Sequence, residues 1–335
     1  KSCTQHCTFD LNLDQTAGTV KDTALTLACR LGHGDKARVL IEASASVHVR
    51  DAYGSSPLIL AVQNKNIEIV AQLLSAKASI NACNYSGATP VAVACGIGAP
   101  KMVRYLVANE ANVDSKTRDG TTPLFYACRL GSLDICEYLV RDAKAKVNAR
   151  RYDGATCLQF ACKGGHLSIV RFLVEEAKSN LHALTRKGAS CLLTACLNAH
   201  FRVVKYLLEK RAHVNMSNNS GYGPLHGACQ VGNLACVMLL VNHKADLQLN
   251  HSYRNRGFAV SELSYESLDM STPLSIARAN GRSEVVMYLE KAMKAVRDRE
   301  GKSGRPWHQA ASNGGSLESK PRSRASSWAS CQDFW

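Results

Sequence analysis

Apolar and polar positions along the chain follow a pattern of two short apolar runs that returns every 33 or 34 residues. Residues 119–131 read DGTTPLFYACRLG, and residues 153–165 repeat them as DGATCLQFACKGG. A second run follows each copy with the i, i+3, i+4 spacing of one helix face, as in Ile69, Val70, Leu73 and Leu74. This spacing is typical of amphipathic helices. Each copy therefore predicts two short helices joined by a tight turn.

One glycine marks the period through most of the chain. It recurs at Gly54, Gly87, Gly120, Gly154, Gly188 and Gly221. Lys21 holds the equivalent place one copy earlier, and the last copy, at 272–277, is delayed by about sixteen extra residues. A fixed period of this size predicts a stack of repeated units, because one helix pair cannot bury its apolar faces alone.

Each conserved place within the unit has a physical reason. The glycine supplies a positive φ in a tight turn. In the best copy, Thr122 is placed to cap the first helix and Pro123 stands at its first position, where a missing N–H costs nothing. This D-x-x-G-x-T-P-L-h-x-A-A-x-x-G-H unit resembles the ankyrin-repeat family over roughly residues 9–294. The resemblance implies an all-α repeat solenoid of about eight helix-turn-helix units with β-hairpin fingers.

Composition and spacing divide the chain into five segments. We expect 1–18 to be the end of a truncated preceding repeat, which makes the chain a fragment of a longer protein. Repeats one to seven take 19–250, and 251–270 is an insertion in a finger, read either as a mobile loop or as a contact element. A terminal capping repeat takes 271–295. A disordered, basic, Ser-rich tail is expected over 296–335.

Two repeats depart from the pattern where the first helix ends. Lys65 and Ala199 stand at the position that usually holds a helix-ending glycine. A non-glycine residue in the left-handed conformation costs about 1 kcal/mol, so we expect these repeats to depend on their neighbours.

Histidine and cysteine are frequent, but their spacing predicts side chains that pack within the fold and does not match a catalytic or metal-binding site. The chain has 14 cysteines, and six of them share the small-residue slot of the first helix: Cys29, Cys95, Cys128, Cys162, Cys196 and Cys229. Stacked helices lie too far apart for equivalent cysteines to bridge. We therefore expect a reducing compartment, cytoplasmic or nuclear, and predict no catalytic residues, no metal and no cofactor.

Charge gives the strongest functional indication. The formal net charge is +14. The positions free to vary line the concave face and the finger tips in the family, and here they are rich in Arg, Lys and Tyr, residue types of which Tyr and Arg dominate binding hot spots. The candidate partner-binding residues are Tyr53, Tyr85, Lys116, Arg118, Arg129, Arg150, Arg151, Tyr152, Lys163, Arg186 and Lys187.

The interpretation is a non-catalytic scaffold or adaptor, monomeric, that binds an acidic protein segment. Two alternatives stay open at this point. Basic charge also serves electrostatic binding of nucleic acid or an anionic membrane surface, although no nucleic-acid-binding motif is present. The second alternative is that the chain is the targeting region of a larger enzyme, whose catalytic domain lies outside the given sequence. In the tail, Arg322 and Arg324 precede Ser327 as in a site for basophilic kinases.

Overall fold

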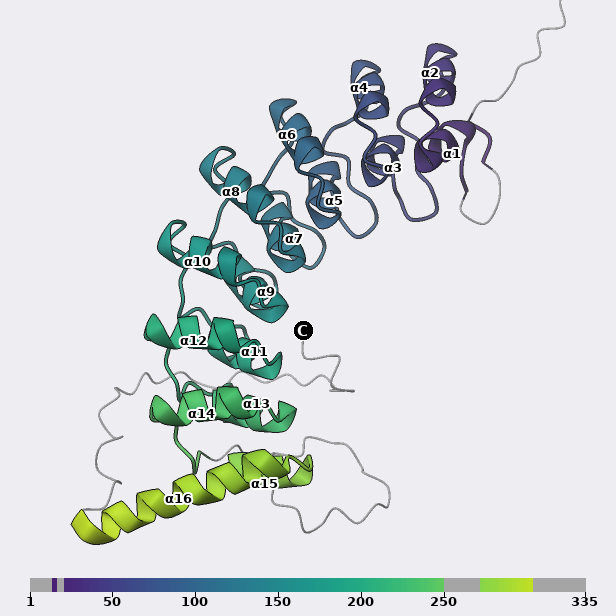
Figure 1. Ribbon diagram of the computed structural model, residues 1–335. Coiled ribbons are helices and arrows are strands. Elements are labelled where there is room, and N and C mark those ends of the chain that lie inside the picture. The colour runs from purple at the N-terminus through teal and green to yellow at the C-terminus, as the bar shows by residue number, and fades with distance from the viewer. Residues whose placement is uncertain (1–13, 17–20, 250–271, 304–335) are drawn as a thin grey trace, which may run out of the picture. The chain divides into compact units, whose positions relative to one another are not determined.

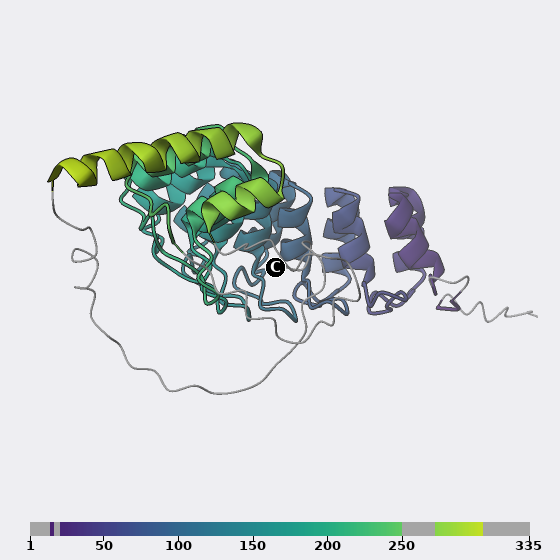
Figure 2. The ribbon, with the colours of Figure 1, turned by 90° about the horizontal axis from the view of Figure 1, so that it is seen from below.

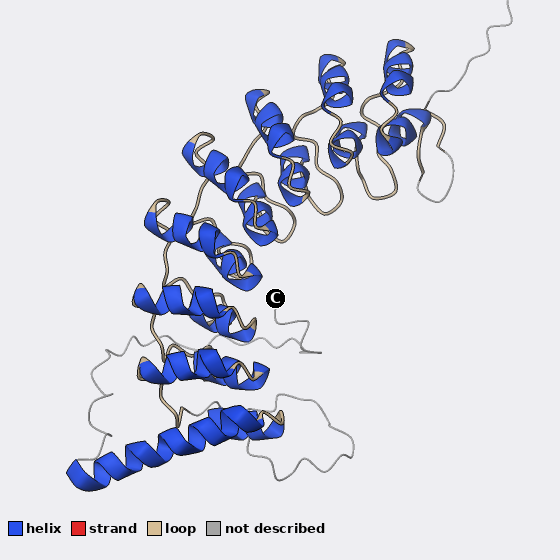
Figure 3. Cartoon of the chain, viewed as in Figure 1, coloured by secondary structure: helices blue, strands red, loops and turns tan. Residues whose placement is uncertain are grey.

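The computed structural model describes residues 14–16, 21–249 and 272–303, and these form pairs of short antiparallel helices (Figures 1 and 3). The chain divides into an N-terminal unit, residues 1–212, and a C-terminal unit, residues 213–335. We number the helix pairs as repeats one to eight. The insertion predicted at 251–270, most of the segment 1–18 and Ser327 lie outside the described residues.

In the N-terminal unit the first helices of successive repeats pack in one layer and the second helices in another (Figure 1). The first helices are α1 (Ala24–Leu31), α3 (Pro57–Gln63), α5 (Pro90–Gly96), α7 (Pro123–Leu130), α9 (Cys157–Gly164) and α11 (Cys191–Leu197). The second helices are α2 (Gly34–Glu42), α4 (Ile67–Ser75), α6 (Pro100–Ala108), α8 (Leu133–Arg141), α10 (Leu167–Glu175) and α12 (Phe201–Glu209).

The core lies between these layers and follows the predicted period. In each of repeats two to six one leucine of the second helix is fully buried: Leu73, Leu106, Leu139, Leu173 and Leu207. The cysteines of the first-helix slot described in the sequence are also fully buried. Burying a large aliphatic side chain contributes about 1.5–3 kcal/mol. The stack is therefore stabilised by one continuous apolar row that no single repeat could form.

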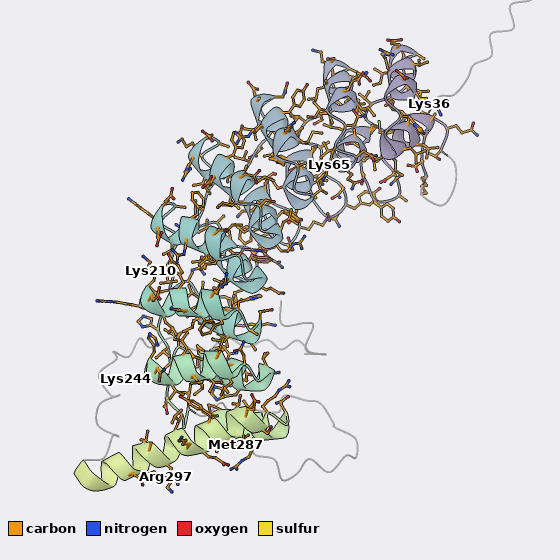
Figure 4. All side chains as sticks on the ribbon, in the orientation of Figure 1. Lys36, Lys65, Lys210, Lys244, Met287 and Arg297 are labelled. Atoms are coloured by element: carbon orange, nitrogen blue, oxygen red, sulfur yellow. The ribbon has the colours of Figure 1, made fainter. Side chains whose placement is uncertain are left out.

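Cation–π contacts connect the second helices along their outer side. The guanidinium of Arg104 lies 4.4 Å from the ring centre of Tyr138 in the next repeat, and Arg171 lies 5.2 Å from Tyr206. Lys210, labelled in Figure 4, donates to Glu175 of the preceding repeat at 3.0 Å. These outer cations thus serve the stacking of repeats.

In the N-terminal unit a finger loop leads into each of the first helices α3, α5, α7, α9 and α11, and Figure 2 shows these loops projecting together from one side of the helices. These finger loops span 51–55, 84–88, 117–121, 151–155 and 185–189, and the C-terminal unit has its own at 218–222. In the first of these, the N–H of Asp51 donates to the carbonyl of Ser55, and the N–H of Gly54 donates back to Asp51, both at 3.0 Å. Each finger is therefore a closed turn.

The described residues 14–16, 21–249 and 272–303 contain no β-strand, so the prediction of β-hairpin fingers is not confirmed (Figure 3). Adjacent fingers share a single backbone hydrogen bond, such as the one from Tyr85 N–H to the Tyr53 carbonyl at 3.0 Å. One bond per pair of fingers is too little for a strand ladder, which needs several in register.

The unusual positions in the sequence have the backbone predicted for them. Lys65 and Ala199 end their first helices with φ of 58° and 57°, and Lys21 holds φ of 53° at the finger glycine position. Gly54 needs to be glycine for a second reason. A Cβ there would lie 2.5 Å from the ring of Tyr85.

The C-terminal unit contains repeats seven and eight, built from α13 (Pro224–Val231), α14 (Leu234–Asn242), α15 (Pro273–Ala279) and α16 (Ser283–Ser303). Val285 and Leu289 of α16 are buried, whereas Met287 and Arg297, labelled in Figure 4, are exposed. Helix α16 continues to Ser303. The tail predicted to begin at residue 296 is therefore helical over its first eight residues. Residues 296–300 contain no glycine or proline, and the helix ends two residues after Gly301.

Candidate protein-binding surface

Three tyrosines present their rings at the finger tips of the N-terminal unit. Tyr53, Tyr85 and Tyr152 are 65 %, 55 % and 54 % exposed. Tyrosine rings supply much contact area for little conformational entropy, which suits them to binding surfaces. The sequence placed all three at the tips, and the structure agrees.

Cations occupy the remaining tips. Arg118 and Arg186 hold the same finger position as Tyr85 and Tyr152, and Lys116 and Lys187 are close to them in sequence; all four cations are exposed. The backbone fixes their order, since the N–H of Arg118 donates to the carbonyl of Ser86 at 2.9 Å and that of Arg186 to Asp153 at 2.7 Å. Tyrosine and arginine therefore alternate along one edge, one side chain per repeat.

A second row of cations lies where the first helices end. Arg129 is in the last turn of α7 and Lys163 in the last turn of α9. His166 Nε2 donates to the Arg129 carbonyl at 3.1 Å, and His200 Nε2 donates to the Lys163 carbonyl at 2.8 Å. Each histidine thus connects its own repeat to the backbone of the preceding one, at the residue that carries the cation.

The environment of Lys163 is electropositive. Partial burial lowers the pKa of its ammonium group below the ordinary value, and the charges of Arg129 and Arg151 lower it further. Arg129 itself lies 5.3 Å from the ring centre of Tyr126. Burial and the charge of Asp119 raise the pKa of the Tyr126 hydroxyl, which keeps that ring neutral. Cationic and aromatic groups are thus concentrated on repeats four and five.

Two of the candidate partner-binding residues make contacts within the protein that could not be predicted from the sequence. Arg151 is only 18 % exposed, pairs with Asp119 at 3.3 Å and with Asp153 at 3.5 Å, and lies over the ring of Phe160. Arg150 donates to the Leu184 carbonyl at 2.9 Å and so connects two fingers. We therefore remove Arg150 and Arg151 from the residues that contact a partner directly.

Asp119 is the acidic member of this region. Burial alone would raise the pKa of its carboxyl group, but hydrogen bonds from Thr117 and Thr121 and the charge of Arg151 together hold that pKa below the ordinary value. Asp119 is therefore ionised at neutral pH and neutralises Arg151. Arg118, at the tip of the same finger, remains an exposed cation.

The buried thiols are poorly suited to chemistry. Burial raises the pKa of Cys29 and of Cys229 to about 12, and a thiol must ionise before it acts as a nucleophile or ligand. The Sγ atoms of Cys128 and Cys136 lie 3.7 Å apart. Among the described residues no group of His, Cys, Asp and Glu side chains is arranged to hold a metal ion.

Sequence reasoning missed one buried polar group. Gln159 is fully buried in α9; its Oε1 accepts the Thr156 N–H at 2.9 Å, and its Nε2 donates to the Ala189 carbonyl at 2.8 Å. His226 makes the matching contact in repeat seven, where its Nδ1 accepts the Gly223 N–H at 3.0 Å. Gln159 and His226 each stand three residues after the helix cap. This shared position was the sequence feature from which their contact with the cap N–H could have been predicted.

Comparison with known families agrees with this architecture. The family model described as ankyrin repeats (3 copies) matches residues 3–84, 76–151 and 144–218, and the model described as ankyrin repeat matches residues 220–252. The chain belongs to the ankyrin-repeat family. Ankyrin repeats generally mediate protein–protein interactions and are typically non-catalytic modules. The comparison with curated proteins found no match.

Helix α16 and its partner α15 lie beyond the matched ankyrin repeats but keep the same helix-pair arrangement. None of the helices in the described part of the chain is long and apolar enough to cross a membrane.

Proposed function

We propose that this ankyrin-repeat protein is a non-catalytic adaptor that binds an acidic segment of a partner protein across the finger tips and first-helix ends of repeats three to six. The observation that carries the proposal is the alternation of exposed tyrosine and arginine along the finger edge. A row of Arg129 and Lys163 runs beside it. An extended segment laid along this edge would meet one new side chain in every repeat.

Charge and ring chemistry together favour an acidic polypeptide over other anions. Arginine binds carboxylates through a planar fork, and tyrosine packs against aliphatic or peptide groups at low entropic cost. The exposed rings are separated by cations, so they do not form the continuous stacking platform that single-stranded nucleic acids use. A flat anionic membrane would attract all exposed cations to a similar extent. It would not require tyrosine and arginine to alternate along the edge.

We expect the affinity of this surface for its partner to be the sum of many contacts that are each weak. Exposed ion pairs contribute about 0.2–1 kcal/mol each. Reversing Arg118, Arg129 and Arg186 to glutamate therefore removes about 1–3 kcal/mol and adds repulsion, which predicts at least a tenfold loss of affinity. Because all three side chains are exposed, the folded state should be nearly unaffected.

The test uses the whole chain and an array of short synthetic peptides that ranges from strongly acidic to strongly basic. Wild-type protein should select acidic peptides, and the variant Arg118→Glu/Arg129→Glu/Arg186→Glu should lose them. The matched control reverses three exposed cations of the outer helices, Lys101, Arg202 and Lys205. The control changes net charge by the same amount and should keep most of the binding.

Two results would overturn the proposal. Equal loss in both triple variants would show that net charge attracts the peptides and that the finger edge is not a site. Preference for a polynucleotide competitor over every acidic peptide, with affinity falling steeply as salt rises, would indicate phosphate-backbone binding instead.

A further inference from the structure

A row of Asn and Asp side chains connects successive repeats of the N-terminal unit. Each of these side chains accepts a backbone N–H that lies one repeat further along the chain. The four pairs, acceptor first, are Asp14 with Ser46 at 3.0 Å, Asn81 with Asn112 at 2.9 Å, Asp114 with Lys146 at 2.9 Å and Asn148 with Asn180 at 3.0 Å. The same backbone donor is thus satisfied by the same kind of side chain at each of these junctions.

His48 stands in this row between Asp14 and Asn81, and the row is interrupted there. The N–H that corresponds to it belongs to Ser79, which lies 31 residues after His48 as Asn112 lies after Asn81. No group in the described ranges 14–16, 21–249 and 272–303 accepts the Ser79 N–H. Since the equivalent N–H groups point at the Asn or Asp of the row, that of Ser79 points toward the place of His48.

A cavity of about 200 Å³ lies at this interruption. It is lined by Val47, His48, Arg50, Ser56, Ala78, Ser79 and Ala82. Val47 and Ala78 are buried, whereas His48, Arg50 and Ser79 are exposed, so the basic groups lie toward solvent. A water molecule takes about 30 Å³ of liquid volume. The cavity therefore has room for a small polyatomic ion, and its lining contains two basic side chains and no carboxylate.

The guanidinium of Arg50 is held in place at this cavity. Its Nη1 donates to the carbonyl of Gly54 at 2.9 Å and also to the carbonyl of Cys83. Its Nε and Nη2 have no acceptor in the part of the chain that the structure describes. Arginine carries its N–H donors in a planar, rigid fork that matches the oxygens of an anion. Arg50 thus offers a guanidinium that is already oriented and has donors to spare.

Ser56 adds a hydroxyl donor on the buried side of the cavity. Its Oγ accepts the Ile59 N–H at 3.3 Å as the cap of α3, and its O–H donates to none of the described residues. Ser56 is 5 % exposed. A buried hydroxyl normally finds an acceptor. An anion in the cavity would supply one.

Repeat five shows the same arrangement with the row intact. The Nη1 of Arg150 donates to two finger carbonyls, at 3.4 and 2.9 Å, as that of Arg50 does. Asn148 fills the place of His48 there and binds the Asn180 N–H. The oriented arginine is therefore common to both places, whereas the available backbone donor is found where histidine replaces asparagine.

We propose that His48, Arg50, Ser56 and the backbone N–H of Ser79 bind one phosphate group. This phosphate site is separate from the finger edge, because none of its residues is among the candidate partner-binding residues. A phosphate monoester has a charge of about −1.5 to −2 at pH 7 and three strong acceptor oxygens, which suits donors from four residues. A carboxylate has only two oxygens and would leave part of this donor set without a partner.

The first measurement compares two backbone amides of the whole chain by NMR. Sodium phosphate is added at constant pH and ionic strength, with sodium chloride as the reference salt. The Ser79 amide proton should shift downfield and saturate at millimolar phosphate, together with the ring signals of His48. The Asn180 amide, which Asn148 already binds, should not respond. Equal shifts at Ser79 and Asn180, or no shift at Ser79, would overturn the site.

The variant His48→Asn closes the phosphate site from within. Asparagine holds this position at Asn81 and Asn148, so the variant should fold, and its side-chain oxygen should accept the Ser79 N–H. Phosphate should then bind at least tenfold more weakly than to the wild type. His33→Asn is the matched control, because it removes an exposed imidazole elsewhere in the same unit, and it should bind phosphate normally. Wild-type phosphate affinity in His48→Asn, or equal weakening in both variants, would contradict the proposal.

Two further probes decide where the phosphate comes from. Inorganic phosphate and a short phosphoserine peptide are titrated separately against the Ser79 amide. Tighter binding of the phosphoserine peptide would indicate a phosphorylated partner, and tighter binding of inorganic phosphate would indicate the free ion; both results support the site. Sodium acetate is the third probe. If acetate shifts the Ser79 amide at the same concentrations as phosphate, the ligand is a carboxylate and the assignment of a phosphate is wrong.

Discussion

The buried amide of Gln159 gives the sharpest prediction about stability. Its side chain is the acceptor for the Thr156 N–H at 2.9 Å and a donor to the carbonyls of Ala189 at 2.8 Å and Ala183 at 3.3 Å. Gln159→Met keeps the length of the side chain but removes all three contacts. Thr156 is buried, so its N–H would be left without a partner in a place that water does not reach.

The magnitude follows from these contacts. An unsatisfied buried donor costs about 1–3 kcal/mol, and the lost contact to Ala189 adds about 1 kcal/mol. The more apolar methionine recovers about 1 kcal/mol. The net loss of unfolding free energy should be about 2 kcal/mol. Urea unfolding followed by helical circular dichroism measures it.

His226 supplies the control for this experiment. It accepts the Gly223 N–H at the same helix position in repeat seven. Gln159→His should therefore retain the contact to Thr156 and lose roughly half as much stability as Gln159→Met. Equal stability of Gln159→Met and wild type, within about 0.5 kcal/mol, would refute the reasoning.

Three further outcomes are expected. Leu124→Ala should destabilise the protein by about 2–5 kcal/mol in the same assay, because Leu124 is 1 % exposed; a near-neutral result would place α7 in another register. Lys65→Gly should raise stability by about 1 kcal/mol by relieving its positive φ of 58°, and a loss of stability would contradict the strain argument. Asp119 has a lowered pKa, so its stabilisation is present above the pKa of the unfolded chain and disappears as the pH falls through the folded value. Acid unfolding of Asp119→Asn should therefore lack that part of the pH dependence, and an unchanged acid limb would show that Asp119 does not contribute.

The repeat architecture could be predicted because its determinants are local and occur many times. A helix cap, a turn glycine and an apolar spacing act within one unit, and copies confirm one another. The exceptions could also be predicted, since Lys65 and Ala199 adopt the positive φ that their positions require. The end of α16 could not be predicted. Composition alone indicated disorder from residue 296, but the charged residues 296–300 contain no helix breaker and the helix continues to Ser303.

The candidate surface was only partly predictable, because exposure depends on contacts between repeats. Arg118 and Arg151 look alike in the sequence. The structure separates them, since Arg151 reaches Asp119 of the preceding finger and the ring of Phe160, whereas Arg118 projects from its tip.

The central claim concerns location, and photo-crosslinking tests it most directly. The acidic peptide selected on the array would carry a photoreactive residue at successive positions, and its crosslinks to the whole chain would be mapped by mass spectrometry. The account predicts crosslinks to the finger loops at 84–88, 117–121 and 151–155 and to the last turns of α7 and α9. Crosslinks concentrated on the outer helices α6, α8, α10 and α12 would contradict it.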